Sequence, residues 1–198
     1  MITVMTGRTH DLAAITALGI VFLSNPVQPL RLSTAIMAII ANLIGGITPD
    51  IDQPTAPFWR NLPIGNIFGR TFGRLSGGHR FLTHSIAGAA LIGFGVHWLL
   101  VFFTPVMGQI DTGYVWWAFM IGLVSHLVMD MFTKEGVPLL LPIPIKFGVP
   151  PLRRLRITTD KWVENLLVFP GLLALNGLLV ALHYEEILEI LRRIGSSH

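Results

Sequence analysis

Two residues of the chain, His126 and Asp130, have the spacing of a metal-binding or hydrogen-bonded pair. Residues four positions apart lie on one face of a helix, so this imidazole and this carboxylate can bind one cation together. A buried His–Asp hydrogen bond that joins two helices is the alternative interpretation. Further residues with suitable chemistry stand near the ends of other apolar stretches: His10, Asp50, Asp52, His79, His84 and Glu164.

Two short motifs strengthen the metal interpretation. Asp50 and Asp52 follow a proline that ends a helix, and carboxylates in an extended turn commonly offer oxygens to a cation. A helix stop with solvated carboxylates is the alternative. His79 and His84 lie five residues apart at the start of a helix that Thr83 can cap, and this segment alone also fits an ordinary interfacial loop.

The donor set defines which metals the chain can bind. The sequence contains no cysteine, so thiolate ligands are excluded. Histidines and carboxylates together suit Zn²⁺, and also Mn²⁺ or Fe²⁺, and eight donors are enough for two ions. A divalent transition metal, most simply zinc, activates water and stabilises a phosphoryl or acyl transition state. The predicted chemistry is hydrolysis.

The composition predicts where these residues act. Of the 198 residues, 52% are hydrophobic and 13% charged, and the mean hydropathy is +0.65. One water-facing globule of this size cannot bury so much apolar surface, which argues against a soluble enzyme. We therefore predict an all-α, polytopic bundle of membrane helices. It contains five apolar stretches: Leu12 to Ser24, Leu32 to Ile47, Ser85 to Pro105, Tyr114 to Phe132, and Leu166 to Tyr184.

The last three stretches approach the roughly 20 residues that cross a bilayer. The first two are shorter and form either thin spans or one re-entrant hairpin. Eleven Lys and Arg residues then fall on one side of the membrane and three on the other. Since cytoplasmic segments are enriched in these residues, the N-terminus and the connections at 48–84 and 133–165 are predicted to be cytoplasmic. All eight metal-type residues lie at that level, where ionisable groups near hydrocarbon are costly and usually functional.

The ordered set of motifs resembles the bacterial and archaeal family of membrane-bound, metal-dependent hydrolases that includes LexA-regulated inner-membrane proteins. The resemblance extends from about residue 9 to 170. It rests on Thr9-His10, Pro49-Asp50-Ile51-Asp52, Gly78-His79-Arg80, Thr83-His84-Ser85, and Ser125-His126 through Asp130 to Gly136-Val137-Pro138-Leu139-Leu140.

This resemblance implies metal-ligand roles for eight residues, with Asp52, His84 and Glu164 also acting in catalysis. The metal ligands are His10, Asp50, Asp52, His79, His84, His126, Asp130 and Glu164. The His-x-x-x-Asp pair is also similar to the zinc-binding helix of zinc-dependent phospholipases C and P1-type nucleases. That similarity points to phosphoester substrates.

The position of the site favours a lipid substrate, because a headgroup can reach it sideways through the leaflet. Between Asp52 and His79, glycines recur every four residues beside Arg70 and Arg74. A helix here would present an apolar side, a small-residue side and two arginines for a phosphate, and a flexible lid is the alternative. Arg80 is the third predicted substrate-binding residue.

We therefore predict a single domain over residues 1–198, with an amphipathic C-terminal tail at 184–198. It is expected in the inner or plasma membrane of a bacterium or archaeon, with a membrane lipid as substrate and no nucleic-acid partner. An ion-coupled transporter and a metal-stapled, non-catalytic scaffold are the alternative functions. A transporter predicts polar residues at mid-membrane, whereas a scaffold predicts a metal whose coordination is closed by protein ligands.

Overall fold

The computed structural model describes residues 7–24, 31–53, 56, 59, 65–75, 80–143, 145–157 and 162–196. These residues form helices and loops without a named strand, and two isolated β-bridges occur among them, Thr133–Ile157 and Val137–Phe147. The prediction of an all-α helical bundle is confirmed. The helical elements are α1 (Gly7–Ser24), α2 (Leu32–Ile47), η1 (Thr48–Asp52), α4 (Gly65–Leu75), α5 (Ile86–Met107), α6 (Thr112–Met131), η2 (Arg153–Leu155), η3 (Glu164–Val168), α7 (Phe169–Leu182) and α8 (Tyr184–Ser196).

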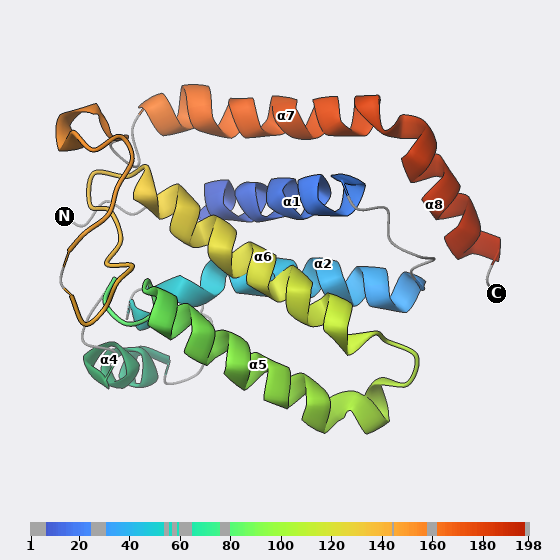
Figure 1. The fold of residues 1–198 in the computed structure, drawn as a ribbon, viewed down its shortest axis with the longest axis horizontal. Helices are drawn as coiled ribbons and strands as arrows, with labels where there is room; N and C mark the ends of the chain where they lie inside the picture. The colour runs from blue at the N-terminus through green and yellow to red at the C-terminus, as the bar shows by residue number, and fades with distance from the viewer. Residues whose placement is uncertain are drawn as a thin grey trace.

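The first four predicted apolar stretches each correspond to one helix, and the second has the same bounds as α2. The fifth covers the end of η3, all of α7 and the first residue of α8. Among the described residues, four helical segments are long and apolar enough to cross a membrane: Leu32–Asp52, Ile86–Met107, Thr112–Met131 and Glu164–Leu182. Helix α1 is not one of them. It runs antiparallel to α2, between α7 and α6 (Figure 1). The two interpretations of the first two stretches, thin spans or one re-entrant hairpin, both predict that α1 and α2 are antiparallel.

Helices α2 and α6 form the closest pair of the bundle, and small residues permit this approach. A side-chain carbon on Gly45 would overlap the backbone of Phe119, and one on Gly122 would overlap the backbone of Asn42. The Asn42 amide donates across the interface to the carbonyl of Ala118 at 3.0 Å. Small residues and interhelical hydrogen bonds are the usual means by which membrane helices associate. This contact fixes the end of α2 beside the end of α6.

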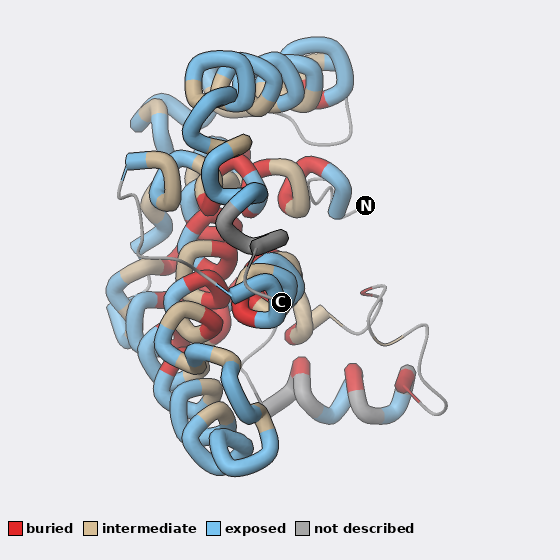
Figure 2. Tube along the Cα trace, turned by 90° about the vertical axis from the view of Figure 1, so that its right-hand side faces the viewer, coloured by how far each residue is buried: buried red, intermediate tan, exposed pale blue. Residues whose placement is uncertain are grey.

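The outer faces of the bundle are apolar. Helix α7 has no buried residue, and large hydrophobic side chains on α5 and α7 are exposed, among them Phe94, Phe102, Leu173 and Leu178. Figure 2 shows buried residues gathered in the middle of the bundle and exposed residues along its outer helices. Apolar exposure of this extent is typical of a surface that faces lipid rather than water.

Helix α4 confirms the helical interpretation of the glycine-rich segment over Gly65–Leu75. Its Gly65, Gly69 and Gly73 are buried, whereas Ile67 and Arg70 are exposed. The helix packs against η1, which carries two of the predicted ligands. At the far end of the chain, Tyr184–Ser196 forms α8 over the predicted C-terminal tail.

Candidate metal centre

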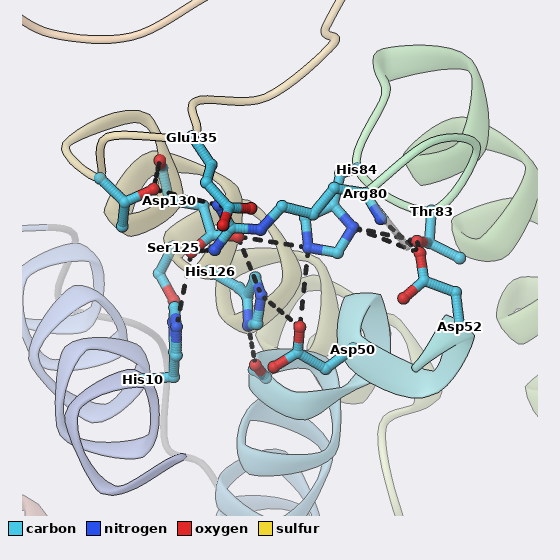
Figure 3. Close-up of polar contacts among 12 residues, drawn as sticks. His10, Asp50, Asp52, Arg80, Thr83, His84, Ser125, His126, Asp130 and Glu135 are labelled. Carbon is cyan, nitrogen blue, oxygen red and sulfur yellow. Dashed lines mark hydrogen bonds and ion pairs between the residues drawn. The ribbon is translucent and has the colours of Figure 1, made fainter. Parts of the chain in front are cut away.

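The predicted metal-type residues that the structure describes converge on one end of the bundle. His10 lies in the first turns of α1, Asp50 and Asp52 in η1, and His84 in the turn before α5. His126 and Asp130 lie in the last turns of α6. Figure 3 shows their side chains directed toward one another from these separate elements. His79, predicted as a ligand, lies outside the described residues.

Four ligand-type atoms form the centre of this cluster: Asp50 Oδ1, His84 Nε2, His126 Nε2 and Asp130 Oδ2. The His84 nitrogen is 3.3 Å from the Asp130 oxygen and 3.7 Å from the Asp50 oxygen. The His126 nitrogen is 3.7 Å and 3.6 Å from the same two oxygens. A tetrahedral ion with bonds of about 2.0–2.1 Å holds neighbouring ligand atoms about 3.4 Å apart. These four His–carboxylate separations are close to that spacing, and Asp50, His84 and His126 form a group of donor atoms close enough to share an ion.

The hydrogen bonding of the cluster also fits a cation. Asp50 Oδ1, His126 Nε2 and Asp130 Oδ2 are buried and make no hydrogen bond of normal geometry. Buried polar atoms without a hydrogen bond are rare because each carries an uncompensated desolvation cost. A metal ion coordinated by these atoms would remove that cost.

Each histidine is oriented through its other ring nitrogen. His126 Nδ1 is hydrogen-bonded to the backbone carbonyl of Gly46, which makes Nδ1 the donor and leaves the Nε2 lone pair directed into the cluster. His84 Nδ1 lies 3.0 Å from the hydroxyl of Thr83. That hydroxyl donates in turn to Asp52 Oδ2. Such partners fix the tautomer and the orientation of metal-binding histidines.

Asp52 was predicted as a metal ligand and a catalytic residue. Its position lets it hold the turn that carries His84. It is fully buried, and its Oδ2 accepts hydrogen bonds from Thr83 and from the backbone N–H of Arg80 at 3.0 Å. The carboxylate thus holds the turn that carries His84. Of the two carboxylates in η1, Asp50 is the one whose oxygen forms a potential metal-binding group with His84 and His126.

Arg80, predicted to bind substrate, lies inside the protein and is 3% exposed. Its Nη2 donates to Asp130 Oδ1 at 2.8 Å, and its Nη1 contacts Thr133 Oγ1 at 3.1 Å and Glu135 Oε2 at 3.4 Å. Its backbone has a φ of 58°, in the left-handed region that costs a non-glycine residue about 1–2 kcal/mol. The hydrogen bonds at both ends of the residue offset that cost. Arg80 therefore fixes one oxygen of Asp130 and leaves the other directed toward the histidines.

The charge balance at His84 favours a cation. Burial by itself lowers the pKa of His84, but its close contacts with the Asp130 and Asp52 carboxylates and the charges of these groups outweigh burial and raise the pKa to about 9. The neighbouring carboxylates therefore favour a proton on His84 when no ion is bound. A divalent cation would displace that proton and supply the charge instead.

His10 and Glu164 extend the cluster on the side of α1. The His10 ring stacks on His126 with centroids 3.9 Å apart, and its Nε2 lies 3.7 Å from Asp130 Oδ1. His10, His126 and Asp130 form a second group of donor atoms close enough to share an ion. Glu164 is fully buried and accepts a hydrogen bond from Thr9 at 2.8 Å, so it holds the start of η3 against α1. A second ion stays a prediction.

The two other predicted substrate-binding residues lie on α4. The side chain of Arg70 is exposed. Arg74 belongs to the same helix, and its side chain lies outside the described part of the chain. Sequence reasoning did not anticipate the contact between Glu135 and Arg80, nor the role of the Gly46 carbonyl. The only sequence signal for either is nearness to a predicted ligand, which does not specify a contact.

The Thr83 hydroxyl offers a direct test of the oriented histidine. Thr83→Val preserves the shape of the side chain and removes the hydroxyl that links His84 to Asp52. We expect zinc binding to weaken about 10–100-fold, as is usual when a partner of a metal-binding histidine is lost. Zinc affinity can be measured by competition with a chelator. Thr104→Val removes a comparable hydroxyl from α5, where it bonds to the carbonyl of Leu100, and should leave zinc affinity unchanged. Equal zinc affinity in Thr83→Val and the native protein would show that the hydroxyl does not orient a ligand.

These features define a class: a helical membrane protein with a buried His/Asp cluster at one end of its bundle. The chain belongs to the YdjM inner membrane protein family, whose sequence model matches residues 5–186. It is similar to YvsG of Bacillus subtilis (strain 168), an uncharacterized protein, with 28% identity over 168 residues that cover 83% of this chain and 88% of YvsG. No solved structure matches it. The predicted resemblance to a family of inner-membrane proteins is confirmed at this level.

Proposed function

We propose that this protein is a membrane-embedded, metal-dependent hydrolase that cleaves a phospholipid or another membrane phosphoester. The observation that carries the proposal is the set of four ligand-type atoms from Asp50, His84, His126 and Asp130 at separations of 3.3–3.7 Å. Two imidazoles and two carboxylates suit zinc, and also manganese or iron. In such a site the ion supplies Lewis acidity and activation of water.

The protein's own residues position these ligands. Asp52 and Thr83 orient His84, the Gly46 carbonyl orients His126, and Arg80 holds one oxygen of Asp130. The Asp50 side chain is 20% exposed, so the cluster lies next to the protein surface on the side of η1. His10 lies against His126 and Asp130, where it serves a second ion or a proton transfer.

An apolar groove supports a lipid substrate. Helices α1, α6 and α7 line a groove of about 550 Å³ whose walls include Ala13, Ile20, Trp117, Met129 and Leu172. Ala13 lies one helical turn after His10, and Met129 directly precedes Asp130. A hydrocarbon chain in this groove would place its headgroup beside the cluster, because the groove runs along α1 and α6 toward their site-bearing ends. Arg70, exposed on α4, is a proposed headgroup contact at the same end.

The scaffold alternative has an observation in its favour, since four protein atoms are enough to close a tetrahedral zinc site. The transporter alternative requires its ionisable residues at mid-membrane or on both sides. The titratable cluster described above lies at one end of the bundle. A measurement of turnover therefore distinguishes the proposed hydrolase from the scaffold, whereas a measurement of metal content does not.

The proposal predicts that purified protein retains a transition metal and cleaves lipid only while it is bound. Elemental analysis would identify the metal, and product release from vesicles containing phosphatidylglycerol, phosphatidic acid or cardiolipin would measure turnover. Removal of the metal by a chelator should reduce turnover at least about 100-fold, because Lewis-acid catalysis contributes several kcal/mol. Added zinc or manganese should restore it.

Two results would contradict this function. Stoichiometric metal in a protein that turns over none of these lipids would favour the scaffold. Turnover that persists after the metal has been removed would separate the cluster from catalysis. As a control, Asp111→Asn removes a carboxylate at the opposite end of α6, and the metal content and turnover of this variant should match those of the native protein.

A further inference from the structure

The loop that follows α6 contains a charged cavity. It has a volume of about 440 Å³ and is lined by Lys134, Glu135, Lys146, Arg153 and Arg156. The loop lies at the same end of the bundle as the metal cluster (Figure 1). Four basic side chains and one acidic side chain surround the space, so it carries an excess of positive charge that the metal proposal does not use.

The walls of this cavity are held by hydrogen bonds. Lys134 N–H donates to the carbonyl of Ile157 at 3.1 Å, and Val137 and Phe147 exchange two backbone hydrogen bonds. Arg153 Nε donates to the carbonyl of Lys134 at 3.0 Å. The basic residues therefore project from an ordered loop rather than from independent surface positions, and less conformational entropy is lost when they bind a ligand.

Arg156 is held most firmly of the four. Its Nε donates to the carbonyl of Pro150 at 2.8 Å, and its Nη2 donates to that of Pro151 at 3.0 Å. Its guanidinium lies against the backbone of Gly148, where any side-chain carbon would overlap it, and close to Gly136, whose φ is +65°. The loop is thus shaped around this guanidinium. Arg156 Nη1 makes no hydrogen bond with the described residues and can donate to another acceptor.

The acidic residue of the cavity does not neutralise it. Glu135 contacts Arg80 at 3.4 Å, and Arg80 in turn donates to Asp130 of the metal cluster. The side chains of Lys134 and Lys146 make no ion pair with the residues that the structure describes, and both are exposed. The Glu135–Arg80–Asp130 sequence of contacts also places the cavity directly beside the proposed hydrolytic site.

We propose that Lys134, Lys146, Arg153 and Arg156 form a binding site for a phosphate group next to the metal centre. Clustered Lys and Arg side chains with a held guanidinium match the charge and the acceptor oxygens of phosphate. The group is either the headgroup phosphate of a membrane lipid or free phosphate. The assignment of this phosphate to a lipid substrate rests on the proposed function. Phosphate binding itself requires no turnover.

The test compares the native protein with Lys134→Gln/Lys146→Gln in neutral detergent. These side chains form no hydrogen bond with the described part of the chain, so their replacement should leave folding and metal content unchanged. Calorimetric titration with inorganic phosphate should show saturable binding to the native protein that is about ten-fold weaker in the double variant, because two solvent-exposed charged contacts are lost. Arg31→Gln/Arg192→Gln removes the same charge from exposed positions outside this loop and should bind phosphate as the native protein does.

A second titration distinguishes the sources of the phosphate. Competition by short-chain phosphatidylglycerol would identify a headgroup site, whereas binding of inorganic phosphate without such competition would identify a site for free phosphate. Either result supports the proposal. The absence of saturable phosphate binding in the native protein, or equal weakening in both double variants, would overturn it. Zinc content and lipid turnover are measured separately, so phosphate binding in a protein without turnover would refute the proposed function alone.

Discussion

Replacing Asp130 with Asn is expected to abolish both bound metal and turnover. Asp130 is fully buried, and its two oxygens face different partners, Oδ1 toward Arg80 and Oδ2 toward His84. Asparagine has nearly the same shape but no negative charge, so it is a poor metal ligand, and it removes the buried carboxylate partner of Arg80, whose other carboxylate contact among the described residues, Glu135, is 31% exposed. Breaking a buried pair in this way costs about 3–5 kcal/mol. We therefore expect a lower melting temperature together with loss of zinc.

The double variant Asp130→Asn/Arg80→Gln separates these two effects. Removal of the Arg80 guanidinium should restore much of the thermal stability, since an intact buried pair is often nearly neutral relative to uncharged replacements. Zinc and turnover should stay absent, because the ligand is still missing. Native-like zinc occupancy in Asp130→Asn, measured by elemental analysis of folded protein, would exclude Asp130 from the site. Asp111→Asn is again the matched control on α6, because its side-chain oxygen can still cap the helix at Gly113.

Replacing Gly122 with Ala is expected to damage the metal centre from within the helix interface. The added carbon would overlap the carbonyl of Asn42 and approach the backbone of Gly46. Because backbone atoms cannot rotate away, α2 and α6 must separate, and overpacking of this kind costs about 1–3 kcal/mol. The same movement would carry η1 and Asp50 away from His126. We expect a lower melting temperature and weaker zinc binding, although Gly122 contacts no ligand atom.

Gly177→Ala provides the matched control in α7. A side-chain carbon there meets no neighbouring atom within 4 Å, so the substitution should raise helix stability by up to about 1 kcal/mol and leave zinc affinity unchanged. Zinc affinity and melting temperature are measured for both variants in the same detergent. Native-like values of both quantities in Gly122→Ala would show that the close approach of α2 and α6 is not required for the centre.

The sequence by itself determined the helical class and the location of the candidate centre. Long apolar stretches can satisfy their backbone hydrogen bonds in a membrane only as helices or closed barrels, and their lengths favoured helices. The order of the stretches also determined which polar residues lie on the same side of the membrane. Two helices joined by a short turn end on the side of the membrane where they began. His126 and Asp130 were predicted as a pair from their i, i+4 spacing alone, which fixes two residues on one helix face before any tertiary contact is known.

Only the tertiary structure decided which donors meet and which residues orient them. Asp50 and Asp52 are equivalent as sequence signals, yet the turn of η1 directs Asp50 toward His126 and Asp52 toward Thr83 and the backbone of Arg80. Arg80 was predicted to bind substrate, but its side chain is buried and donates to Asp130. Such contacts join segments far apart in the chain. They depend on how closely α2 and α6 approach at Gly45 and Gly122, and no local spacing encodes that distance.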